Sequence, residues 1–211
     1  MKQFHEAMRA LPLVAILRGL PPSQAEAVGR VLIDSGFTLL EVPLNSPEPY
    51  ESIALLAKTY GEQALIGAGT VMSVDEVDRV TAAGGRMIVS PHTDADLIRA
   101  AKQRDLVCLP GVATPSEALT ALKAGADALK LFPAETLPPK ALQAWRAIIS
   151  SNVLLLPVGG ITPVNMQAYW TAGASGFGLG SALYKPKYTL ADLEFNARRF
   201  VSTFGKLGKK D

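Results

Sequence analysis

The sequence has little cysteine, little histidine and no long apolar run. Cys108 is the only cysteine in 211 residues, so no disulfide can form within the chain. The two histidines, His5 and His92, lack the spacing of a metal site. No apolar run approaches the roughly 18 residues of a membrane-spanning helix, and the first residues lack the apolar segment of a signal peptide. We therefore expect a cytoplasmic protein with no bound metal, no internal disulfide and no membrane partner.

The charge balance excludes a further class of partner. The formal net charge is only +2, and no basic stripe is interleaved with aromatic residues. Such a chain lacks the electrostatic surface that nucleic-acid binding requires. With 48% hydrophobic and 19% charged residues, the composition instead predicts one globular domain spanning residues 1–211 with a sizeable core.

Short runs rich in Val, Ile and Leu alternate with longer stretches of helical spacing, as in βα units around a parallel sheet. The sequence therefore predicts a single-domain (β/α)8 TIM barrel, with a short helix over residues 2–10 and an amphipathic last helix over residues 190–204. A doubly wound open sheet is the alternative, but no Gly-x-Gly-x-x-Gly turn follows the first strand. The expected strands are residues 13–17, 39–44, 65–69, 87–90, 106–109, 128–132, 153–158 and 176–179.

Lys130 lies in the middle of an apolar strand, in Ala128-Leu129-Lys130-Leu131-Phe132. An ammonium in apolar surroundings tends to lose its proton, and a neutral lysine amine is a nucleophile toward carbonyls. The alternative is a lysine whose stem is buried while its ammonium reaches water. The first interpretation predicts an enzyme that forms a Schiff base.

Two more charges lie at predicted strand ends, where a barrel of this kind places its active site. Glu41 is surrounded by apolar residues, and burial of a carboxylate raises its pKa. It could serve as the general acid and base for imine chemistry, or form a structural ion pair with Arg18 or Lys130. Arg18 could bind an anionic group or pair with Glu41.

Glycine-rich segments follow the last two predicted strands, at Val158-Gly159-Gly160-Ile161 and at Gly178-Leu179-Gly180-Ser181. In such barrels these two loops often hold a phosphate on backbone N–H groups, because glycine allows close approach. We therefore expect a phosphorylated ligand. Thr70 ends the third strand and could contact a substrate carboxylate or cap the next helix. Cys108 lies in a buried strand and is interpreted as a core residue rather than a nucleophile.

Five features occur in this order along the chain: Glu41, Thr70, Pro91, the segment from Lys130 to Glu135, and Gly159-Gly160-Ile161. The KDPG/KHG aldolases have such features in the same order, and the chain resembles this family over about residues 11 to 185. The resemblance implies a (β/α)8 barrel, a class I mechanism without a cofactor, and a homotrimer. It also implies site residues. Lys130 is then the Schiff-base lysine and Glu41 the acid/base, Thr70, Pro91 and Phe132 line a pyruvate pocket, and Gly159, Gly160, Ile161, Gly180 and Ser181 hold phosphate.

Two positions depart from the gluconate-type members of the family. Those members carry an arginine four residues after the glutamate, where this chain has Asn45, and tend to have Thr or Ser where it has Val158. Both positions resemble the galactonate-type branch and are expected to contact the substrate. The implied reaction cleaves a phosphorylated 2-keto-3-deoxy sugar acid into pyruvate and glyceraldehyde 3-phosphate, and Arg18 helps to position that substrate.

Other functions remain open on the residues alone. A gluconate-type or 4-hydroxy-2-oxoglutarate aldolase would use the same lysine and glutamate. A phosphate-binding isomerase or synthase without covalent chemistry would explain the glycine loops, but not Lys130. A sugar-phosphate-binding regulatory module that has lost catalysis would bind ligand without turnover.

Overall fold

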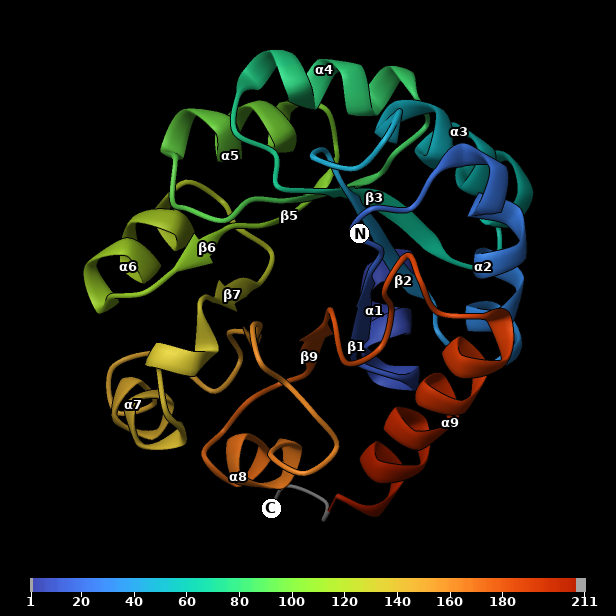
Figure 1. Cartoon of the computed structure of the whole chain (residues 1–211). Helices are drawn as coiled ribbons and strands as arrows, with labels where there is room; N and C mark the ends of the chain where they lie inside the picture. The colour runs from blue at the N-terminus through green and yellow to red at the C-terminus, as the bar shows by residue number, and fades with distance from the viewer. Residues whose placement is uncertain (1, 208–211) are drawn as a thin grey trace.

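Parallel strands form a curled sheet at the centre of the molecule, with helices around its outside (Figure 1). The computed structural model describes residues 2–207. Six strands pair in the order β5-β4-β3-β2-β1-β9, and three more pair as β6-β7-β8. Every strand pairing within residues 2–207 is parallel, as expected for βα units. The strands are β1 Leu13–Ile16, β2 Leu39–Pro43, β3 Leu65–Gly69, β4 Met87–Val89, β5 Val107–Leu109, β6 Gly111–Val112, β7 Leu129–Leu131, β8 Leu155–Pro157 and β9 Phe177–Leu179.

The α/β class and all eight predicted strand positions are confirmed, but the expected single closed sheet is resolved as two sheets. The predicted strand at residues 106–109 continues past Pro110 as β6, and Pro110 separates the two sheets along the chain. The Pro110 carbonyl faces β7, where it accepts the Lys130 N–H at 2.9 Å, and proline has no N–H to donate on that side. At the other edge, one isolated parallel bridge joins Val158 to Gly178.

Several helices begin where the sequence provides capping residues. The Ser73 hydroxyl accepts the Glu76 N–H, and Thr114 forms a reciprocal capping box with Glu117. The predicted helices at residues 2–10 and 190–204 are confirmed, the second ending at Lys206. The helices are α1 Lys2–Ala10, α2 Pro22–Asp34, α3 Pro49–Tyr60, α4 Val74–Ala82, α5 Ala95–Gln103, α6 Pro115–Lys123, α7 Pro139–Trp145, α8 Met166–Thr171 and α9 Leu190–Lys206, with a 3-10 turn η1 at Ala134–Thr136. None of those within residues 2–207 is long and apolar enough to cross a membrane.

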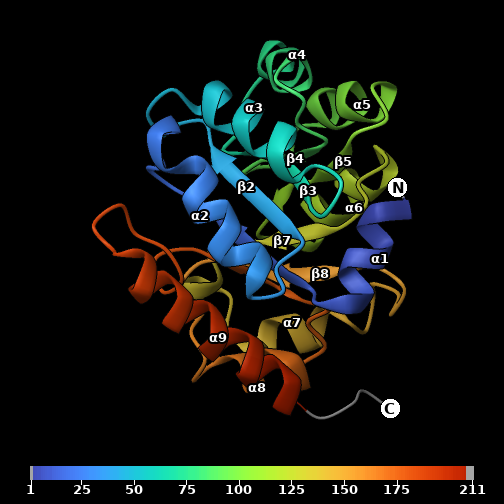
Figure 2. The same cartoon turned by 90° about the vertical axis from the view of Figure 1, so that its right-hand side faces the viewer.

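Helix α1 closes the end of the sheet where the strands begin. Its buried residues Phe4, Ala7 and Met8 share a hydrophobic cluster with strand residues such as Val14 and Leu65. In Figure 2, α1 lies beyond the tail of the β2 arrow. Because apolar side chains fill this end, a ligand must enter at the opposite end, where the strands finish.

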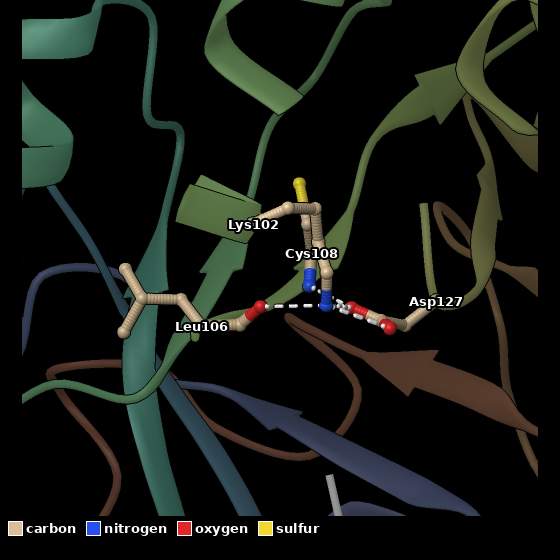
Figure 3. A network of polar contacts seen from close by, with 4 residues as sticks. All are labelled: Lys102, Leu106, Cys108 and Asp127. Atoms are coloured by element: carbon tan, nitrogen blue, oxygen red, sulfur yellow. Dashed lines mark hydrogen bonds and ion pairs between the residues drawn. The ribbon is translucent and has the colours of Figure 1, made fainter. Parts of the chain in front are cut away.

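A polar network at the same closed end joins α5 to the starts of β5 and β7 (Figure 3). The Lys102 Nζ donates to Asp127 Oδ2 at 2.7 Å and to the Leu106 carbonyl at 3.0 Å, while Asp127 Oδ2 also accepts the Cys108 N–H at 2.8 Å. Burial raises the pKa of the Cys108 thiol to about 12, so the thiol stays protonated near neutral pH. Cys108 therefore lies in the core as expected, in surroundings that stabilise the fold rather than carry chemistry.

Candidate active site

A cavity of about 530 Å³ opens where β1, β2, β7, β8 and β9 end. Its walls contain most of the site residues that the sequence suggests. Ten of them line it: Arg18, Glu41, Lys130, Phe132, Val158, Gly159, Gly160, Ile161, Gly180 and Ser181. A concave site at the carboxyl ends of parallel strands is where enzymes of this architecture bind substrate.

Lys130 projects into this cavity from β7. Only 5% of the residue is exposed, and its Nζ lies 4.6 Å from the centroid of the Phe132 ring. Burial lowers the pKa of the Lys130 ammonium, Arg18 lowers it further, and the negative charge of Glu41 opposes both effects. The side chain therefore stays inside the protein instead of extending to bulk water, which favours a neutral amine over a snorkelling ammonium.

Glu41 enters the same cavity from β2 and is only 2% exposed. Burial raises the pKa of this carboxyl to about 7, against the opposing effects of Lys130 and Arg18. Within the described residues, Glu41 Oε2 is buried without a hydrogen-bond partner and the carboxylate forms no ion pair. The structural ion pair is therefore not observed, and the carboxyl group can exchange a proton near neutral pH.

Arg18 is held by a neighbour rather than by Glu41. Its Nη1 donates to Asn45 Oδ1 at 2.7 Å, and its Nη2 lies 3.5 Å from Thr70 Oγ1. Arg18 lines the cavity, whereas Asn45 and Thr70 lie behind it and are not among the lining residues. Asn45 therefore fixes the orientation of Arg18, which lines the cavity.

The loop after β8 has the backbone geometry expected of a phosphate cradle. Gly159 and Gly160 have φ angles of 104° and 63°, a region that favours glycine. Asn165 fixes the loop, because its Nδ2 donates to the Gly160 carbonyl at 2.9 Å and its Oδ1 accepts the Thr162 N–H at 2.9 Å. Successive backbone N–H groups in such turns form concavities that bind anions.

Pro91 is another predicted site residue that lies outside the lining of this cavity. It follows β4, its backbone packs against Gly111, and it is not among the residues that line the cavity. The pyruvate pocket expected from Thr70, Pro91 and Phe132 is thus represented in the cavity wall by Phe132 alone.

Several lining residues were not identified from the sequence: Ile16, Gly19, Glu135, Thr162, Ala182, Tyr184, Lys185 and Pro186. Tyr184 is 4% exposed, and its hydroxyl is a second buried oxygen without a partner in the described part of the chain. Lys185 adds a cation close to the predicted phosphate loops. The signal was present in Tyr184-Lys185-Pro186, which follows the Gly180-Ser181 loop within a few residues.

A metal centre has no support in the described residues. Over residues 2–207, no group of three or more His, Cys, Asp or Glu side chains could hold a metal ion. The chemistry that the cavity offers is that of a buried amine and a nearby carboxyl group of raised pKa, two groups that can form an imine and move protons.

Known proteins are similar to this chain in sequence and in fold. A protein from Rhizobium meliloti (strain 1021) named "Probable 2-dehydro-3-deoxy-6-phosphogalactonate aldolase" is 46% identical over 186 residues, 88% of each chain. The 2-dehydro-3-deoxy-6-phosphogalactonate aldolase of Escherichia coli (strain K12) is 42% identical over 92% of this chain and 95% of its own.

Solved structures of aldolases have the same fold as this chain. The structure described as "Native KDPGal structure" superposes with a TM-score of 0.92 at 41% identity, over 93% of this chain and 96% of that one. A KDPG aldolase from Legionella pneumophila, with pyruvate captured as a covalent carbinolamine intermediate, has a TM-score of 0.80 at 27% identity, over 96% and 97% of the two chains. The family model for KDPG and KHG aldolase matches residues 4–194, and this chain belongs to that aldolase family.

Proposed function

We propose that this protein is an aldehyde-lyase, a class I aldolase that cleaves 2-dehydro-3-deoxy-6-phospho-D-galactonate to pyruvate and D-glyceraldehyde 3-phosphate in galactonate degradation. The observation that carries the proposal is Lys130, a buried amine of lowered pKa beside Glu41 in a cavity at the ends of the strands. The relatives at 46% and 42% identity bear the galactonate name, and the gluconate-type Legionella protein is 27% identical.

The reaction begins when neutral Lys130 adds to the C2 ketone of the substrate and forms a carbinolamine. Glu41 supplies the proton with which the hydroxyl group leaves as water, and a protonated imine remains. The Glu41 carboxylate then takes up the C4 hydroxyl proton, the C3–C4 bond breaks, and its electron pair moves into the imine to give an enamine. Glyceraldehyde 3-phosphate leaves, Glu41 protonates the enamine carbon, and water releases pyruvate and the free amine.

The remaining cavity residues position the substrate. The loops that contain Gly159, Gly160, Ile161, Gly180 and Ser181 bind the phosphate through backbone N–H groups, as at other anion sites built on glycine loops. Phe132 packs beside the reacting carbons, since its ring lies next to the Lys130 amine. Thr70 and Pro91 are proposed to complete the pyruvate pocket beside Phe132, with Thr70 next to the Arg18 guanidinium. Binding energy from the distant phosphate orients the C3–C4 bond for cleavage.

Lys185 supplies positive charge to the phosphate site, because it lines the same cavity as the glycine loops. We expect Lys185→Met to raise KM for the phosphorylated substrate about 10- to 100-fold, the value of one charge-assisted hydrogen bond, with kcat within about twofold. Steady-state kinetics of pyruvate release measure both constants. Exposed Lys187 provides the matched control, and Lys187→Met should leave KM unchanged. An equal KM for Lys185→Met and the wild type would contradict this role.

The choice between C4 epimers depends on Asn45 and Val158. Val158 lines the cavity and presents methyl groups where gluconate-type members place a hydroxyl, while Asn45 holds Arg18 at 2.7 Å. Arg18 therefore has a fixed orientation toward the substrate. A site built around one hydrogen bond to a hydroxyl group discriminates against the epimer that cannot form it.

Comparison of the two epimeric substrates tests this proposal. We expect kcat/KM for the 6-phosphogalactonate substrate to exceed that for the 6-phosphogluconate substrate by about 10- to 100-fold, with measurable cleavage of both. Equal efficiency would favour the gluconate-type alternative. Failure to cleave either substrate, combined with binding of sugar phosphates, would favour a non-covalent isomerase, synthase or binding module.

We propose that the enzyme is a single-domain cytoplasmic protein, as the composition indicates, and that it acts as a homotrimer, as the resemblance implies. We also propose that the sheet closes as one eight-stranded barrel. Support for closure comes from the bridge between Val158 and Gly178, and from β5 and β6, which flank Pro110 as two parts of one strand.

A further inference from the structure

The Glu41 carboxylate packs against the backbone of β3. β2 and β3 pair in parallel, with Glu41 opposite Gly67 and Pro43 opposite Gly69. Residues two apart on a strand point to the same face, so any side chain at Gly67 or Gly69 would share the face of Glu41. Both positions are glycine, so neighbouring atoms can occupy the space that a side chain would otherwise fill.

Gly69 is the position that cannot hold a side chain while Glu41 keeps its place. The three atoms nearest to a Cβ built at Gly69 are Oε2, Cδ and Oε1 of Glu41, and each of them would overlap it. A Cβ built at Gly67 would instead overlap the Met87 backbone on β4. The two glycines of one strand therefore have different neighbours, and only Gly69 touches the carboxylate.

No hydrogen bond holds the carboxylate in this position. Glu41 Oε2 has no partner in the described residues, so its place is defined by shape and by the charges of Lys130 and Arg18. The strand beneath it is well fixed. The Gly69 carbonyl accepts the Leu44 N–H at 2.8 Å, and Thr70 follows with a φ of 57°, which is unusual for a β-branched residue.

We propose that Gly69 is a positioning residue for the general acid/base: its missing side chain creates the dry recess that holds the Glu41 carboxylate against β3. The role of Glu41 as acid/base rests on the proposed function. The contact between Gly69 and the Glu41 carboxylate is independent of that function. A methyl group at residue 69 pushes the carboxylate away from β3 into the open cavity, nearer to water. Better solvation favours the ionised form.

The first test is a stability cycle that needs no activity. We expect Gly69→Ala to destabilise the wild-type chain in urea unfolding, because a well-packed site has no room for the extra methyl. In the Glu41→Ala background, where the overlapping atoms are absent, the same substitution should be tolerated. If Gly69→Ala alone does not fold, the double variant should still fold. Equal destabilisation in both backgrounds would overturn the proposal.

The second test follows the carboxyl group itself. Carbon-13 NMR of glutamate-labelled protein should show a carboxyl resonance that titrates near pH 7 and is absent in Glu41→Gln. In Gly69→Ala we expect this titration to move toward the ordinary value of 4.5. Exchange of pyruvate methyl protons with D2O, which reports enamine protonation, should fall about 100-fold, the effect of a misplacement of about 1 Å.

Gly67→Ala is the matched control on the same strand. It should lower stability through contact with Met87 but leave the carboxyl titration near pH 7. An unchanged titration in Gly69→Ala, or the same shift in both variants, would overturn the positioning role. Full activity of Glu41→Gln would instead contradict the proposed function, and the stability cycle would still report on the recess.

Discussion

Replacement of Lys130 by methionine should lower kcat for cleavage about 10⁴-fold or more, because it removes the buried amine that forms the imine. Methionine keeps an unbranched apolar stem next to Phe132 and removes an amine whose pKa is already lowered by burial. The chain should therefore remain folded, since loss of a buried amine relieves its desolvation. Pyruvate release and circular dichroism measure the two effects.

The matched control for this variant is exposed Lys123 at the end of α6. Lys123→Met should retain wild-type kcat. Activity of Lys130→Met within about tenfold of the wild type would contradict the covalent mechanism. Global unfolding of that variant would indicate that Lys130 has a structural role instead.

Replacement of Glu41 by glutamine should reduce kcat about 10²- to 10⁴-fold, the usual contribution of a positioned general acid/base. The wild-type carboxyl has a pKa raised to about 7, so its acid and base forms are both populated at neutral pH. An ionisation near pH 7 should therefore appear in the pH profile of kcat/KM and be absent from that of the variant. Glu51→Gln, at an exposed position of α3, should preserve both kcat and the profile.

The outcome for Glu41→Gln also separates two explanations of its raised pKa. A carboxyl group that is buried only for structural reasons would leave kcat nearly unchanged when its proton exchange is removed. A variant with wild-type kcat and an unaltered ionisation near pH 7 would exclude Glu41 as the proton-transfer group and assign that ionisation to another residue.

The most informative residues could be predicted because they break a strong local pattern. Lys130 and Glu41 each interrupt an apolar strand, and an ionisable group in such a place must line a cavity or be paired. The strands and the α1 and α9 helices could be predicted because they follow a pattern instead. The strands are short apolar runs, and the two helices have apolar residues at helical spacing. Lys185 interrupts no apolar strand; the sequence marks it only by its nearness to the Gly180-Ser181 loop, and the fold places it in the wall of the same cavity.

Other features depend on relations between strands that a linear pattern does not contain. The division of the sheet at Pro110 depends on the pairing of β5 with β4 before this residue and of β6 with β7 after it. Asn45 could be predicted as a specificity position, but its hydrogen bond to Arg18 could not. The contact of Gly69 with Glu41 likewise exists only because β3 lies beside β2.

The covalent bond to Lys130 is the central claim, and borohydride reduction tests it most directly. The protein is incubated with pyruvate and sodium borohydride, digested, and mapped by peptide mass spectrometry, with Lys130→Met treated in parallel. We expect one reduced pyruvate adduct, on the peptide that contains Lys130, and none in the variant. An adduct on a different lysine, or no adduct under conditions in which the enzyme cleaves its substrate, would contradict the Schiff-base mechanism.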